Sequence, residues 1–172
     1  FRSNGNVTAK TNSLAAAIGG GNSGSGDVTI LDGRVTTQLV NKNDPVTGIG
    51  GAPNSTDKST VRILGGVVDA VGGGYGSGIG GGRGDAQGAE VEIGGGAQVT
   101  AKGGKGGTYS SKTYGAGAAI GTNGDKDGKA GKELDVNAIG EGTVTRINSQ
   151  LPAEHKHEWT LVSSTPAAVG QL

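Results

Sequence analysis

Three tyrosines are the residues best suited to ligand binding, and they provide most of the aromatic content of the chain. The 172 residues contain three Tyr, one Trp and one Phe. Tyr75, Tyr109 and Tyr114 follow the third apolar cluster of a repeating unit, in consecutive units, so we expect them to lie near one corner of the fold. Grouped aromatic rings can form a platform for sugar rings or for a partner protein. The alternative is that these rings only cover the glycine-rich loops beneath them.

A second candidate site is the integrin-type tripeptide Arg83-Gly84-Asp85. It falls in a glycine-rich loop, which we expect to be exposed. The equivalent loop is rich in Gly, Asn and Asp in every unit, so the alternative is that the triplet arose by chance.

A third candidate is a calcium loop formed by Asn123, Asp125, Asp127 and Glu133, with a glycine at position 128. Alternating oxygen ligands around a glycine turn suit a hard cation that takes six or more oxygens. The pattern departs from a complete calcium loop, because Asn occupies the first ligand position and Glu133 comes one residue early. Three lysines within the segment offset its negative charge. The alternative is therefore a solvated charged turn without a cofactor.

The remaining chemistry-bearing residues do not predict catalysis. Enzymes built on stacked strands gather carboxylates and basic groups on one strand face, and the outward positions here carry Thr, Arg, Glu and Asp without such a cluster. Thr8, Thr36, Thr100 and Thr145 occupy one outward column, which Asp69 interrupts. Threonine columns occur in ice-binding solenoids, but the neighbouring column is charged and irregular. We therefore expect neither an enzyme nor an ice-binding protein.

These residues lie on a repeat whose apolar positions recur regularly. Its glycine-flanked Ile recurs at 18, 49, 79 and 120, in steps of 31, 30 and 41 residues. A second Ile follows at positions 30, 63, 93 and 139, and a Val comes after it at 35, 68, 99 and 144. We expect each of these sets to form one column of core side chains. A period in this range predicts a solenoid, a propeller or a similar array.

Each copy of the repeat contains three apolar clusters separated by glycine-rich turns. Val-x-Ile and Val-x-Ala place apolar side chains on one face of a short strand, and their β-branched residues favour strands over helices. Three short strands in about 30 residues predict one rung of a right-handed parallel β-helix, an all-β solenoid. A propeller blade needs four strands, and a polyglycine II sandwich does not need regular Ile and Val positions.

The same pattern predicts the domain organisation. Residues 1–149 form the repeat domain, with rungs at about 16–46, 47–76, 77–117 and 118–149. Residues 150–172 lose the repeat and are expected to form a cap or a linker to a following module, with a strand at 158–162 and Trp159 over the open end of the core. Residues 6–10 match 98–102 at four of five positions, so we expect the chain to be cut from a longer solenoid.

Composition excludes several classes of protein. The 38 glycines have no three-residue period, so the chain is not collagen-like. Net charge is zero, with 15 basic and 15 acidic residues, which gives no electrostatic case for nucleic acid or an anionic membrane. No apolar run approaches the length of a membrane span, and the absence of Cys excludes a disulfide scaffold.

The segments Ser77–Gly82 and Val91–Ala101 resemble the Gly-rich "GIGGG" β-helix repeats of large secreted or wall-anchored proteins of Gram-positive bacteria. The resemblance covers residues 4–149. It implies an extracellular, cell-surface adhesin that binds a host glycoprotein, such as a secreted immunoglobulin, or a host glycan, and it brings no catalytic residues. The alternative is a structural stalk that holds a binding domain away from the wall. A polysaccharide-acting enzyme is a third interpretation, which the lack of a catalytic cluster disfavours.

Overall fold

A computed structural model describes residues 5–11, 14–83, 88–147 and 157–161. Within these ranges the chain consists of strands, turns and loops without a helix, so the expectation of an all-β protein is confirmed. Consequently, no described segment is a helix of the length and apolar character needed to cross a membrane.

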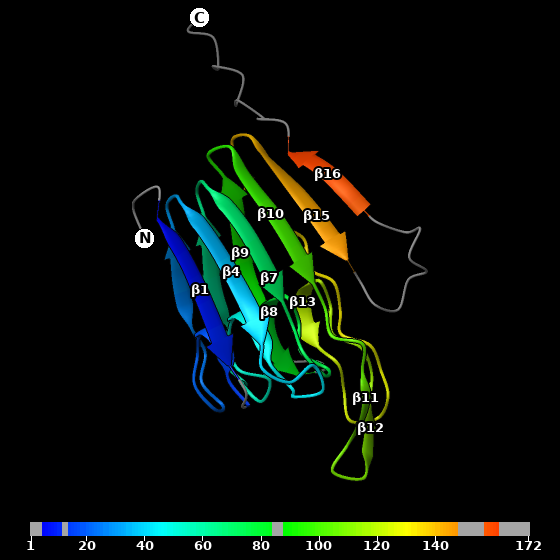
Figure 1. Cartoon of the computed structure of the whole chain (residues 1–172). Coiled ribbons are helices and arrows are strands. Elements are labelled where there is room, and N and C mark those ends of the chain that lie inside the picture. The colour runs from blue at the N-terminus through cyan, green and yellow to red at the C-terminus, as the bar shows by residue number, and fades with distance from the viewer. Residues whose placement is uncertain (1–4, 12–13, 84–87, 148–156, 162–172) are drawn as a thin grey trace, which may run out of the picture.

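Successive strands of the chain are distributed in turn over three parallel sheets (Figure 1). Sheet 1 contains β1 (Asn6–Thr11), β4 (Arg34–Leu39), β7 (Val67–Val71), β10 (Ala97–Lys102) and β15 (Gly142–Ile147). Sheet 2 contains β2 (Ala16–Gly19), β5 (Thr47–Gly50), β8 (Ile79–Arg83) and β13 (Ile120–Asn123). Sheet 3 contains β3 (Asp27–Ile30), β6 (Ser59–Ile63), β9 (Ala89–Gly94) and β14 (Asn137–Ile139).

The register of these sheets confirms most of the predicted columns. Ile18, Ile49, Ile79 and Ile120 stand opposite one another along sheet 2. Val35, Val68, Val99 and Val144 do the same along sheet 1, and Ile30, Ile63 and Ile93 along sheet 3. Side chains from all three sheets meet in a single apolar core. Each copy contributes only a few of these side chains, so it needs the neighbouring copies to bury them.

Glycine follows each Ile of the sheet 2 column because the next copy approaches too closely for a side chain. Gly50 and Gly80 have φ of 123° and 135°, a region that residues with a Cβ rarely adopt. A Cβ on Gly80 would also lie 2.0 Å from the carbonyl oxygen of Gly121. The repeated Ile-Gly pair therefore combines a core side chain with room for the next strand.

The predicted position of Ile139 in the sheet 3 column is wrong. Ala138, not Ile139, stands opposite Ile93, and the Ile139 side chain is 42% exposed. Ala138 precedes Val144 by six residues, the same spacing that separates Ile93 from Val99. Val136 then packs against the core in the place of the usual Val, so the fourth copy carries Val-x-Ala in place of Val-x-Ile.

Two elements depart from the three-sheet pattern. A hairpin of β11 (Gly107–Tyr109) and β12 (Lys112–Tyr114) is inserted between β10 and β13 and projects beyond the ends of the strands (Figure 1). The strand expected at 158–162 is present as β16 (His157–Leu161), which pairs antiparallel with β15 and covers that edge of sheet 1. An antiparallel strand at this edge interrupts the parallel stacking of copies.

Candidate functional site

The three tyrosines come together at the corner where β7 and β10 end. The rings of Tyr75 and Tyr114 stack with centroids 4.1 Å apart and an interplanar angle of 11°. Tyr109 meets both rings edge-on at 6.4 Å. Tyr75 and Tyr114 are buried, whereas Tyr109 is 39% exposed. The corner therefore consists of a buried aromatic pair that supports one accessible ring.

The backbone beneath the rings is closely packed because glycine lines it. Gly104 donates to the carbonyl of Gly76, and Gly106 donates to that of Gly74, each at 2.8 Å. These bonds hold the start of the insert against the loop of the previous copy. A Cβ on Gly76 would lie 1.8 Å from the carbonyl oxygen of Val46, so the loop tolerates no side chain there. The hairpin thus starts from a fixed base.

A groove opens beside the rings because the pairing of β4 with β7 stops early. The last paired residues are Thr36 and Asp69. One residue further, the Thr37 hydroxyl takes the place of a backbone acceptor and receives the Val71 N–H at 2.8 Å. Beyond this point Leu39 and Val71 line a cavity of about 370 Å³. The cavity size falls within the range of small-molecule sites.

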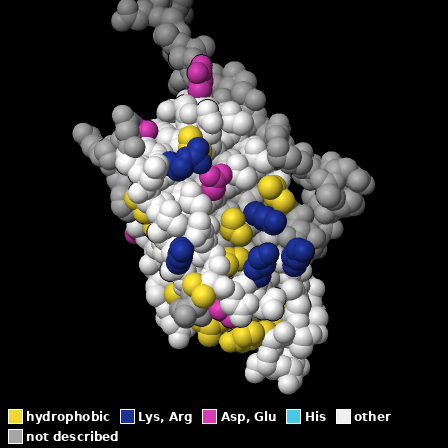
Figure 2. Space-filling model, viewed as in Figure 1, with side chains coloured by type: hydrophobic (Ala, Val, Ile, Leu, Met, Phe, Trp, Pro, Cys, Tyr) yellow, Lys and Arg dark blue, Asp and Glu magenta, His cyan; other side chains and the backbone are white. Residues whose placement is uncertain are grey.

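Three lysines give this groove its charge. Lys42, Lys102 and Lys105 line it, together with Asn43 and glycine backbone from the loops at 72–74 and 103–106. Lys42 is held on a turn in which Asn41 accepts the N–H of Asn43 at 3.1 Å. Figure 2 shows basic side chains gathered on the half of this molecular face that lies nearer the hairpin.

A second, smaller cavity joins the groove to the tyrosines. It measures about 210 Å³ and shares Asn43, Gly74 and Gly106 with the groove. Its other lining residues are Tyr75, Gly107, Thr108 and Tyr109. The tyrosine corner and the lysine groove are therefore neighbouring parts of one concave surface.

No protein-family model, characterised protein or solved structure matches the chain. Function is accordingly inferred from the chemistry of this surface and of the other candidate residues.

Of the tripeptide candidate, the structure describes only the backbone of Arg83. Arg83 is the last residue of β8. Gly84 and Asp85 lie outside the residues that the structure describes.

The proposed calcium ligands are not gathered around one point. Asn123 is fully buried and its Oδ1 accepts from the Thr47 hydroxyl at 3.3 Å and from the Ser77 N–H. Asp125 accepts the N–H of Asp127 at 2.9 Å within an exposed turn. Within the described ranges, no three His, Cys, Asp or Glu side chains are close enough together to hold a metal ion.

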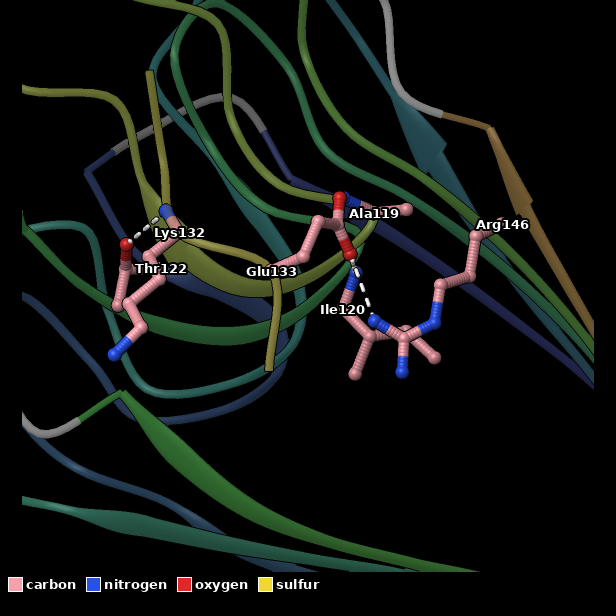
Figure 3. A network of polar contacts seen from close by, with 6 residues as sticks. All are labelled: Ala119, Ile120, Thr122, Lys132, Glu133 and Arg146. Carbon is pink, nitrogen blue, oxygen red and sulfur yellow. Dashed lines mark hydrogen bonds and ion pairs between the residues drawn. The ribbon is translucent and has the colours of Figure 1, made fainter. Parts of the chain in front are cut away.

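Glu133 has a different role, at the end of the stacked copies (Figure 3). Its carboxylate accepts the N–H groups of Ala119 and Ile120 and pairs with the Arg146 guanidinium at 2.9 Å. Ala119 and Ala118 accept from Ile79 and Gly78 of the preceding copy, so donors on this side of a copy normally face the next one. Glu133 therefore supplies the acceptors that a further copy would provide.

Sequence reasoning found the tyrosines but missed the groove. The lysines that line it are separated by up to 63 residues, from Lys42 to Lys105, and two of them lie in loops that the repeat pattern does not place. One available signal was that Lys102 directly precedes the inserted loop. Where the β4–β7 pairing ends, a threonine hydroxyl accepts the next N–H of β7, and the repeat pattern gives no sign of this change.

Proposed function

We propose that the three sheets close into a right-handed parallel β-helix in which each copy forms one rung. The constant order in which strands visit the sheets supports this proposal, as does the single core that all three sheets share. The backbone of residues 129–134 adds to the support. Thr122 donates to the carbonyl of Lys132, and Leu134 donates to that of Ile120, as a further rung would.

We further propose that the chain is a non-enzymatic binding module of a bacterial cell-surface protein. It would act outside the cell and recognise a host glycoprotein, such as a secreted immunoglobulin, or a host glycan. The observation that carries this proposal is the position of Tyr109. Its exposed ring is supported by two buried rings and stands on an insert that breaks an otherwise regular scaffold. Irregular loops on rigid scaffolds commonly carry binding functions.

The outward carboxylates of the described strands favour a binding role over catalysis. Asp69 pairs with Arg34 at 3.1 Å and Glu90 pairs with Lys58 at 3.0 Å. Glu92 likewise pairs with Arg62 of the adjacent strand. These groups neutralise one another across neighbouring copies, so they are poorly placed to act on a polysaccharide. Asp69 also interrupts the threonine column that an ice-binding face would need.

A structural stalk is the second candidate function, and the regular register of the three sheets favours it. A stalk needs only stacking copies and makes no use of an exposed ring. The projecting hairpin and the cavities at its base speak for a binding module instead.

A binding screen of the chain against immobilised host glycans and secreted glycoproteins, including immunoglobulins, tests the proposal. We expect a saturable signal that Tyr109→Ala abolishes. Ile139→Ala is the matched control, because it also removes a partly exposed apolar side chain but lies in sheet 3. If the folded chain binds none of these surfaces, the stalk is the better account.

A further inference from the structure

We infer that the lysine groove and Tyr109 together bind an acidic saccharide, a sugar that carries a carboxylate or a sulfate. This inference rests on the proposed binding function and specifies its ligand class. It is carried by the juxtaposition of three lysines in one cavity with an exposed ring at the wall of the adjoining cavity.

The groove is locally positive in a chain that has no net charge. Its lining includes Lys42, Lys102 and Lys105 and no acidic side chain. Among the described residues, none of these three ammonium groups forms an ion pair, whereas Arg34, Lys58, Arg62 and Arg146 each pair with a carboxylate. Positive groups collected in a concave surface attract an anionic ligand more strongly than the same groups spread over a flat face.

The recognition of charge must come from the lysine side chains, because the glycine backbone is already engaged. Gly72 donates to the carbonyl of Lys102 at 2.8 Å, and Gly74 donates to that of Lys42 at 2.9 Å. Gly104 and Gly106 also donate within the fold. The loops therefore do not present the free N–H groups that cradle a nucleotide phosphate. Lysines are flexible point charges, and they suit acid groups held at variable angles on a sugar.

The tyrosine side of the surface suits the sugar ring itself. Tyr109 offers an exposed aromatic face, and Tyr75 and Tyr114 hold it in place. Asn43 lines both cavities, and its amide can donate to and accept from sugar hydroxyls. A saccharide can thus stack on Tyr109 while its acid group reaches the ammonium groups. A nucleic acid would need a longer basic track, which this neutral chain does not provide.

Calorimetric titration of the full chain can test the inference. The ligands are sialyllactose and a sulfated lactosamine, each beside its uncharged parent sugar, and single-stranded DNA. The groove variant combines Lys42→Gln, Lys102→Gln and Lys105→Gln. The matched control combines Lys126→Gln, Lys129→Gln and Lys132→Gln, which remove the same charge from exposed residues that line neither cavity.

We expect one or both acidic sugars to bind at least about tenfold more tightly than their uncharged parents. The groove variant should lose about tenfold in affinity, and the control variant should not change. Binding should weaken as salt is raised from about 0.01 M to about 1 M, because the screening length falls from about 30 Å to about 3 Å. A preference for sulfate or for carboxylate identifies which acid group the groove takes.

Other outcomes would overturn the inference. Equal binding of acidic and uncharged sugars, unaffected in the groove variant, would refute an acidic ligand but leave the proposed binding function intact. Binding to a host protein that persists after its glycans are removed would also refute an acidic saccharide while leaving the proposed binding function intact. Preferential binding of DNA through the lysines would replace the saccharide with a nucleic acid. If neither sugars nor host glycoproteins bind, both the inference and the proposed function fail.

Discussion

Tyr75, Tyr109 and Tyr114 belong to one cluster but have different roles within it. The stacked pair is buried and closes the corner over glycine backbone, whereas Tyr109 presents its ring to solvent. The sequence suggested either a ligand platform or rings that only cover glycine-rich loops, and the cluster contains residues suited to each role. Two rings cover the loops, and one remains available to a ligand.

This division of roles predicts different effects of two truncations. Tyr114→Ala should lower the free energy of unfolding by about 3 kcal/mol, because it removes a buried ring from a tight stack. Tyr109→Ala should cost only about 1 kcal/mol, since it loses two edge-on contacts of an exposed ring. Urea unfolding of both variants measures the difference. An equal loss of stability would show that Tyr109 is as structural as its neighbours.

Glu133, which the sequence suggested as a metal ligand, instead accepts hydrogen bonds from the last copy of the repeat and pairs with Arg146. Its partner Arg146 is buried, with a side-chain exposure of 6%. Arg146 also occupies an inward position of sheet 1, where the preceding copies have Ala70 and Ala101. The core therefore ends on an ion pair in place of the small apolar side chains.

Glu133→Gln should destabilise the chain by about 2 kcal/mol, because it removes the carboxylate charge that pairs with the buried Arg146 guanidinium. Glu141→Gln, on an exposed side chain, is the control and should have almost no effect. Thermal unfolding of both variants gives the comparison. Adding a chelator should leave the melting temperature of the unmodified chain unchanged, and a clear drop would restore calcium as a ligand of this segment.

At the scale of elements, the columns of Ile and Val set the register of the strands. A slip by one residue turns a strand's core side chains toward solvent, so register is strongly specified wherever one face is buried. β14 is weakly specified, because its apolar residues are reduced to Ala138 and the exposed Ile139.

The observed register predicts different losses of stability for two isoleucines that the repeat pattern assigns to the core. Ile79→Ala should cost about 3 kcal/mol, because Ile79 is fully buried between Ile49 and Ile120. Ile139→Ala should cost less than about 0.5 kcal/mol, because its side chain is exposed. Chemical denaturation of the two variants is the measurement. A comparable loss in both would mean that Ile139 does join the core column.

Much of this element structure could be predicted from the sequence, because apolar spacing directly encodes strand pairing. Ile18, Ile49, Ile79 and Ile120 are aligned as expected, and so are the valines of sheet 1. Ile139 was misplaced because both its residue type and its five-residue distance to Val144 match the first two copies. The strand instead follows the six-residue spacing of the third copy, which places Ala138 opposite Ile93.

At the scale of the whole molecule, one regular scaffold carries one irregular surface. The three sheets repeat with little variation, and the loops at 72–76 and 103–114 depart from the repeat at the same corner. The tyrosine part of this surface was predictable, because the position of each ring within its copy is visible in the sequence. The lysine groove was not, because its lining comes from loops of different copies and lies where the β4–β7 pairing ends, a point that the repeat pattern does not mark.

We propose that binding resides in the hairpin and the cavities at its base. Replacing residues 108–113 with an Asn-Gly turn is the sharpest test, because the Gly107–Tyr114 pair and the stacked rings are kept while Tyr109 is removed. Unfolding of this variant should resemble that of the unmodified chain. Its affinity for the glycan or glycoprotein found in the screen is the decisive measurement. We predict that binding is lost while the fold is retained, and unchanged affinity would contradict the claim.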